Sequence, residues 1–335
     1  MALATVSTRL RTHEFVRLTS TSAVMVAMQV AGTGLTFAFT LILARLMPAS
    51  EVGLVWTVWS AALLASVLAS LNIGNAAIRE VVRAAVHGDT ARVAGFLRVS
   101  RLAIMCLALP VGAAFVLGFS LFDSATFSAY GPLVVLAALM LPVVALERTQ
   151  GALAAALGHP VAGKVSGLLL RPLAIAVVLA AISLTPVAVD AGVALSIMFG
   201  AVLFAAVLQT VLLRPAFAPF SASAPRTDEW RRWLAAGVVL IPSRTLSDNL
   251  KNLCVVAAAL LLSDGDVARF AIAFSLIVFL NFGIMAVDVV FDPRISGAIS
   301  AADPVRRDTM LGLSGLLKLG PVLVGACALW IFGRD

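Results

Sequence analysis

Long apolar runs separated by short polar connections dominate this chain. Nine such runs occur, and each is long enough to cross a hydrocarbon core of about 30 Å as a helix. Strands of a membrane barrel would instead alternate apolar and polar residues over about ten positions. The pattern therefore predicts an all-α polytopic membrane protein with spans at 21–46, 53–76, 98–120, 131–157, 163–184, 188–213, 233–262, 266–291 and 309–332.

The seventh run, 233–262, differs from the others because charged residues interrupt its middle. Arg244, Asp248 and Lys251 fall within about 60° of one another around a helix, and Asn252 lies beside them. Each such charge costs about 2.5–3.5 kcal/mol at the centre of a bilayer. We therefore expect this face to meet a cavity or other helices, with Asp248 offsetting one of the two cations.

Composition and charge placement agree with a membrane protein. The chain is 61% hydrophobic and 12% charged, and its net charge is +7. Most Lys and Arg residues lie in the N-terminal tail and in alternate connections, whereas the opposite connections hold only Arg45 and Arg269. This asymmetry predicts a cytoplasmic N-terminus and argues against a nucleic-acid partner. Arg171 and Lys318, which lie within or at the edge of spans, are expected to snorkel to the membrane interface.

The sequence offers no pattern typical of a metal site, another cofactor or a catalytic centre. Cys106, Cys254 and Cys327 all fall in apolar runs, and the three His residues lie far apart in the chain. We therefore expect neither catalytic residues nor an enzyme.

One glycine-containing segment has the spacing of a phosphate-binding loop. Residues 158–164 read GHPVAGK, but Val165 replaces the Ser or Thr that would reach Mg²⁺, and no strand precedes the segment. We expect a turn here instead, followed by Gly163 and Gly167 as a close-packing face at the start of the fifth span.

An internal repeat relates the two halves of the chain. Residues 46–53 (LMPASEVG) align with 261–268 (LLSDGDVA) at an offset of 215, and the same offset carries Arg79 onto Arg294. Six predicted spans separate the copies, so the repeat is parallel. It predicts an N-terminal six-helix lobe at 1–213, a cytoplasmic linker at 214–232 and a partial C-terminal lobe of three helices at 233–335. The missing helices would then lie at about 346–428, in a protein of about 430 residues.

Several of these segments resemble a known family. Residues 43–48 (LARLMP) with 51–53 (EVG), and 71–79 (LNIGNAAIR), are similar to the opening of Wzx-like bacterial polysaccharide-biosynthesis and O-antigen flippases. These belong to the multidrug/oligosaccharidyl-lipid/polysaccharide (MOP, MATE-like) exporter superfamily. Residues 241–243 (IPS) and 292–296 (DPRIS) resemble the family's second half. The chain departs from the family because its second lobe has only three predicted helices.

The resemblance implies two lobes that face a central cavity. It also implies transport of undecaprenyl-pyrophosphate-linked oligosaccharide across the bacterial cytoplasmic (inner) membrane by alternating access. The implied partners are the lipid-linked glycan, membrane lipid, a polysaccharide polymerase and glycosyltransferases.

Further polar residues at membrane depth are candidates for the wall of such a cavity. Each is equally compatible with hydrogen bonding between helices or, for one adjacent pair, with a local ion pair. Besides the four residues of the seventh run, the candidates are Gln29, Glu147, Arg148, Gln150, Asn281 and Asp288.

Two other functions remain open. A small-molecule or cation antiporter of the same superfamily would use Asp248 or Asp288 to bind the coupling ion, which the two nearby cations disfavour. A membrane-embedded glycan polymerase or transferase would be expected to carry a sizeable polar loop with clustered charges. The longest predicted connection is short, at about 78–97.

The predicted topology places the C-terminus outside the cytoplasm. A reporter that is active only outside the cytoplasm, fused after Asp335, should therefore give signal. The same reporter fused in the predicted cytoplasmic linker at 214–232 should be silent. Signal only from a cytoplasm-specific reporter after Asp335 would contradict the nine-span topology.

Overall fold

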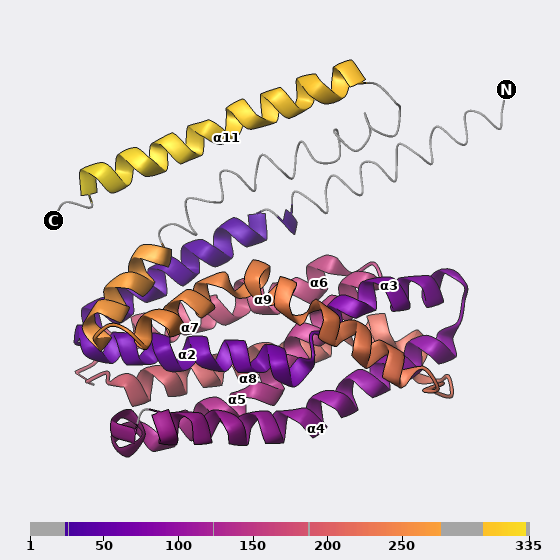
Figure 1. Cartoon of the computed structure of the whole chain (residues 1–335), viewed down its shortest axis with the longest axis horizontal. Coiled ribbons are helices and arrows are strands. Elements are labelled where there is room, and N and C mark those ends of the chain that lie inside the picture. Colours follow the sequence, from indigo (N-terminus) through magenta and orange to yellow (C-terminus); the bar gives the residue numbers. More distant parts are fainter. Residues whose placement is uncertain (1–23, 26, 123, 187, 276–303, 333–335) are drawn as a thin grey trace. The chain divides into compact units, whose positions relative to one another are not determined.

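The computed structural model describes residues 24, 25, 27–122, 124–186, 188–275 and 304–332, and every element within them is a helix (Figure 1). The predicted all-α class is therefore confirmed. The chain divides into two compact units. The larger unit is Ala38–Ile272, and the smaller unit combines Met1–Phe37 with Ala273–Asp335.

Most of the described helices belong to the larger unit. They are α2 (Ala49–Ser70), α3 (Ile73–Val86), α4 (Thr90–Phe122), α5 (Ser124–Ala156), α6 (Pro160–Val165), the π-helical turn η1 (Ser166–Leu170), α7 (Arg171–Ile182), α8 (Ala191–Ser221) and α9 (Trp230–Ala259). Residues 264–275 are also helical. The first helix, Ala27–Leu46, runs across the boundary between the units. The smaller unit contains α11 (Pro304–Phe332).

Six described helices are long and apolar enough to cross a membrane. They are Ala27–Leu46, Ala49–Ser70, Thr90–Leu121, Tyr130–Ala156, Pro160–Ile182 and Ala191–Ser221. These coincide with the first six predicted spans. The predicted seventh and ninth spans are helical in α9 and α11, and only the start of the eighth lies within the described residues. The count of nine spans stays a prediction.

Large apolar side chains cover outward faces of these helices. On α4, Leu109 is 79% exposed and Leu121 is 76% exposed, while Val207 on α8 is 63% exposed. A soluble protein would bury such side chains, whereas a bilayer solvates them. This exposure agrees with a membrane protein.

α5 is the central helix of the larger unit, and it packs against α2, α3, α4, α6 and α8. Its residues Leu141, Ala145 and Leu153 are buried in these contacts. α9 packs on α2 and α3 within the same unit. The predicted separation of an N-terminal lobe from a C-terminal lobe at 214–232 stays a prediction.

The helix formed by α2 and α3 breaks at Leu71 and Asn72. Both residues adopt a left-handed conformation, with φ of 46° and 52°, which costs non-glycine residues on the order of 1–3 kcal/mol. The break is compensated by local hydrogen bonds: Leu71 N–H donates to Leu68 O at 3.1 Å, and Asn72 N–H donates to the Ser70 hydroxyl at 3.3 Å. The N–H groups of both left-handed residues therefore have hydrogen-bond partners where α3 leaves the axis of α2.

The connection between α8 and α9 is shorter than the predicted linker at 214–232. α8 continues through Pro215 and Pro219 to Ser221, so the first part of that segment is helical. The non-helical connection is 222–229.

α5 and α6 approach each other at a pair of glycines. A Cβ atom on Gly151 would meet the Gly163 carbonyl oxygen, and a Cβ atom on Gly163 would meet that of Gly151. The predicted close-packing role of Gly163 is therefore confirmed. The two backbones face each other where a side chain has no room.

Gly151→Ala should destabilise the protein by about 1–3 kcal/mol, because the obstacle is backbone that cannot move aside. Gly200→Ala in α8 is the matched control, since a Cβ atom there meets nothing within 4 Å. Thermal unfolding in detergent should give a lower Tm for Gly151→Ala and an unchanged or higher Tm for Gly200→Ala. Equal Tm values would contradict the close approach.

Candidate functional site

A polar cavity of about 340 Å³ lies within the larger unit. Its wall is formed by α2, α3, α5, the segment α6–η1–α7, α8 and α9. The charged residues in the wall are Glu147, Arg148, Lys164, Arg171 and Asp248. Three cations and two carboxylates leave a formal excess of one positive charge.

Three irregular helix segments meet at this cavity. Asn72, at the α2–α3 break, is one of its lining residues. Gly167 of the π-helical turn is another. The third is Asn249, where α9 kinks with φ −128° and ψ 19°. Irregular backbone at membrane depth is tolerated where it lines a cavity or is buried in protein, and π-helical turns are frequent at functional sites.

Glu147 is the most deeply placed carboxylate of the cavity, at 4% exposed. The Ser166 hydroxyl donates to its Oε1 at 2.8 Å, and Arg171 Nη1 lies 3.3 Å from its Oε2. Arg171 therefore binds a buried carboxylate, and its expected position at the membrane interface stays a prediction. The partner of Glu147 is Arg171 from α7 rather than its neighbour Arg148.

Arg148 connects α5 to the kink in α9. Its Nη2 donates to Asn249 Oδ1 at 3.0 Å, and Asn252 Nδ2 donates to the same oxygen at 3.4 Å. Asn249 is 4% exposed. The cavity cation on α5 thus contacts the residue at which α9 changes direction.

The polar face predicted for the seventh run does not remain on one side of α9. Asp248 lines the cavity, whereas the Lys251 ammonium lies 4.3 Å from the centre of the Trp56 ring of α2. The kink at Asn249 separates these residues, so the regular helical angle used for the prediction does not apply across it. The side chain of Arg244 lies outside the described part of the structure.

Neither Gln29 nor Gln150 is among the residues that line this cavity. Gln29 is in the first helix, within the smaller unit. Gln150 lines a different groove and accepts a hydrogen bond from the Thr210 hydroxyl at 3.3 Å. Asn281 and Asp288 lie outside the described residues.

The cavity also contains residues that the sequence pattern did not single out. Asn72 Nδ2 donates to the Leu240 carbonyl oxygen of α9 at 3.2 Å. Gln209 is 1% exposed and donates to the Glu147 carbonyl oxygen at 3.0 Å. The sequence signal that could have identified Gln209 is that it is a lone amide within an apolar run. Lys164, the last residue of the GHPVAGK segment, also lines the cavity.

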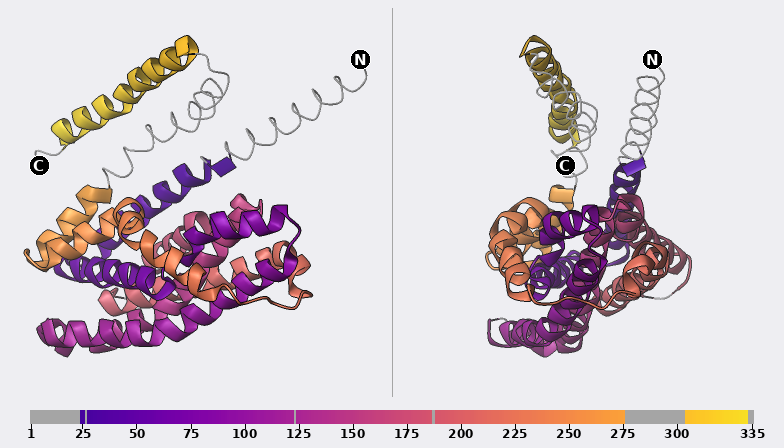
Figure 2. Two further views of the ribbon diagram at one scale, coloured as in Figure 1. Left: turned by 45° about the vertical axis from the view of Figure 1, so that its right-hand side comes forward. Right: turned by 90° about the vertical axis from the view of Figure 1, so that its right-hand side faces the viewer.

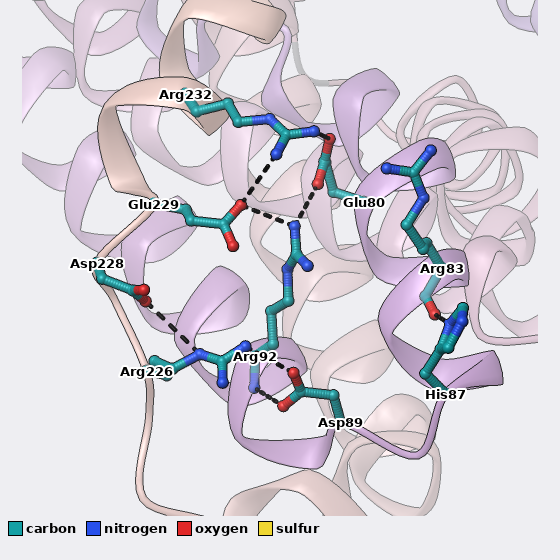
Figure 3. A network of polar contacts seen from close by, with 9 residues as sticks. All are labelled: Glu80, Arg83, His87, Asp89, Arg92, Arg226, Asp228, Glu229 and Arg232. Carbon is teal, nitrogen blue, oxygen red and sulfur yellow. Dashed lines mark hydrogen bonds and ion pairs between the residues drawn. The ribbon is translucent and has the colours of Figure 1, made fainter.

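A closed ring of four ion pairs lies at one end of the larger unit (Figure 3). Arg92 lies 2.9 Å from Glu80 and 2.7 Å from Glu229. Arg232 lies 3.1 Å from Glu80 and 3.4 Å from Glu229. The ring joins α3 and α4 to the start of α9, since each arginine bridges both carboxylates.

The 222–229 connection is held at the same place. Arg226 lies 2.7 Å from Asp89, and its N–H donates to the Ala91 carbonyl oxygen at 3.0 Å. The α3–α4 turn therefore lies beside this connection (Figure 1 and the left panel of Figure 2). Close to this connection in the chain, Trp233 of α9 is fully buried against Phe96 of α4, with ring centres 5.2 Å apart. The start of α9 is therefore fixed to the helices that form the rest of the cavity.

Comparisons with protein-family models, with curated proteins and with solved structures gave no match for this chain. The chemical character of the cavity is thus the basis for its functional interpretation.

Removing one partner of the Glu147–Arg171 pair should be costly. Glu147→Gln leaves the half-buried Arg171 without its counter-charge, and we expect a loss of about 3 kcal/mol. A double-mutant cycle with Arg171→Gln, followed by thermal unfolding, measures the coupling. The double variant should lose less stability than the sum of the single variants. Additive losses would show that the two charges do not interact.

Proposed function

We propose that this chain is part of a transporter that moves an undecaprenyl-pyrophosphate-linked oligosaccharide across a bacterial cytoplasmic membrane by alternating access. The observation that supports this proposal most directly is the polar cavity with an excess of positive charge, whose wall includes four of the apolar helices that are long enough to cross a membrane, namely α2, α5, the α6–η1–α7 segment and α8. A substrate that carries a diphosphate through the bilayer needs such an interior, because hydrocarbon imposes a large desolvation cost on the anion.

The cavity offers suitable donors for a diphosphate. Arg148, Lys164 and Arg171 all line it, and charge-assisted hydrogen bonds to phosphate are stronger than neutral ones. Its volume of about 340 Å³ lies at the lower end of the range for ligand pockets, roughly 300–1,000 Å³. The diphosphate is the part of the substrate that we assign to it. Passage of the glycan would require the helices to move apart, and the breaks at Asn72 and Asn249 are suitable hinge positions.

The resemblance to Wzx-like flippases involves the same structural element. The segment 71–79, which carries part of the resemblance, contains the α2–α3 break and supplies Asn72, Gly74 and Asn75 to the cavity wall. A Cβ atom on Gly74 would lie 3.0 Å from Ala152 of α5. The segment therefore has a physical role at the proposed site, which supports the family proposal.

A cation antiporter is the second candidate, because two carboxylates, Glu147 and Asp248, line the cavity. Glu147 already accepts hydrogen bonds from Ser166 and Arg171. A coupling cation would also have to approach three basic residues. We therefore favour an anionic substrate.

Lys164 provides the cleanest test of charge in the cavity, because it is exposed and its loss should not disturb the buried pairs. Lys164→Gln should reduce surface glycan export by at least about tenfold, since a charge-assisted hydrogen bond contributes about 1.5–3 kcal/mol and every 1.4 kcal/mol is about tenfold. Lys164→Arg should keep most of the export, and Arg83→Gln, outside the cavity, should be neutral. Export is measured in the native cell at equal membrane abundance. Unchanged export with Lys164→Gln would contradict the role of this cation.

Asp248→Asn distinguishes the two candidate functions. A flippase should retain substantial export, because this substitution leaves the cavity more positive and still able to bind a diphosphate. An antiporter that uses Asp248 as its coupling site should lose transport completely. Complete loss with Asp248→Asn together with normal export by Lys164→Gln would favour the antiporter.

A further inference from the structure

A second groove, of about 410 Å³, lies between α4 and α8, with Gln150 of α5 among its lining residues. Arg101 of α4 and Arg214 of α8 line it, together with Phe217 and Phe220. It shares no lining residue with the polar cavity described above. Transport through the cavity therefore does not account for this groove.

Both arginines stand at the boundary of an apolar run. Arg101 immediately precedes residues 102–121, and Arg214 immediately follows residues 191–213. Neither run contains a charged residue, and twenty helical residues span about 30 Å, the thickness of a hydrocarbon core. The two guanidinium groups are therefore expected at the depth of lipid headgroups.

The groove has no acidic counterpart for these charges. None of its lining residues is Asp or Glu, and within the described part of the chain neither Arg101 nor Arg214 forms an ion pair. The nearby arginines 92, 226 and 232 all pair with carboxylates. Two cations thus line one concave surface at the expected depth of headgroups, and an anion complements them.

Apolar side chains continue from the groove along both helices. On α4, Leu102 is 55% exposed and Met105 is 47% exposed. On α8, Val207 is 63% exposed and Val211 is 48% exposed. A ligand with a charged head and long hydrocarbon chains matches this sequence of surfaces, whereas a free phosphate ion would use only the groove itself.

We propose that the α4–α8 groove binds the headgroup of an anionic phospholipid from the adjacent leaflet. Its phosphodiester lies between Arg101 and Arg214, and its acyl chains lie along the exposed apolar faces of α4 and α8. Basic pockets between transmembrane helices recognise anionic headgroups by this combination of charge and depth. This assignment does not rest on the proposed transport function.

The test measures lipid binding to the complete protein purified in detergent, by native mass spectrometry. The probes are phosphatidylglycerol, phosphatidylcholine, inorganic phosphate and undecaprenyl pyrophosphate. The variants are Arg101→Gln, Arg214→Gln and the double substitution. Two control variants accompany them. The double substitution of Arg101→Lys and Arg214→Lys retains both charges, and Arg83→Gln removes an exposed charge outside the groove. Thermal unfolding checks that each variant keeps its fold.

Each single Gln variant should weaken phosphatidylglycerol binding about fivefold, and the double variant more than twentyfold, because a basic residue near the surface contributes about 1 kcal/mol to anionic-lipid binding. The Lys variant should retain most of the binding, and Arg83→Gln should bind like the unmodified protein. Phosphatidylcholine should bind more weakly than phosphatidylglycerol throughout.

Four results would overturn the proposal. The first is unchanged phosphatidylglycerol binding in the double Gln variant. The second is equal affinity for phosphatidylcholine. The third is displacement of phosphatidylglycerol by inorganic phosphate at the same concentration, which would identify a simple anion site. The fourth is loss of undecaprenyl pyrophosphate binding alone in the Gln variants, which would identify a docking site for the transported lipid.

Discussion

A membrane interior requires every backbone polar group to find a partner within the protein, and the helix breaks of this chain meet that requirement around one cavity. Two consecutive left-handed residues end α2, and the amide of Asn72 reaches across to the Leu240 carbonyl oxygen of α9. A π-helical turn at Ser166–Leu170 and a kink at Asn249 complete the set. Residues of all three irregular segments line the same cavity. Polar groups can therefore gather there while the outward surfaces of the long helices stay apolar.

Charge in the larger unit is arranged in two different ways. At the end that carries the 222–229 connection, Arg92 and Arg232 each bridge Glu80 and Glu229, which closes a ring and fixes the start of α9. In the cavity, only part of the positive charge is paired within the described residues: Arg171 contacts Glu147, while Arg148 contacts the neutral amide of Asn249. The first arrangement is structural, and the second leaves positive potential for an anion.

How well the sequence predicts the position of a side chain depends on how regular its helix is. Continuous apolar runs predict the first six helices well, because composition over twenty residues averages out local detail. The polar face of the seventh run was harder to place, since a helical wheel assumes constant geometry and Asn249 breaks it. The sequence does not predict the contact between Arg171 and Glu147, because the two residues lie 24 positions apart on different helices. Hydrophobic periodicity carries no information about contacts between distant helices. The structure was therefore needed to identify Asn72, Lys164 and Gln209 as residues that line the cavity.

The central claim is that the cavity walled by the broken helices holds the diphosphate of a lipid-linked glycan. An electron cryomicroscopy map of the complete protein in lipid nanodiscs, with a polyprenyl-pyrophosphate-linked oligosaccharide added, tests it most directly. We expect diphosphate density between Arg148, Lys164 and Arg171. Diphosphate density elsewhere on the protein, with the cavity closed by apolar side chains, would contradict the claim.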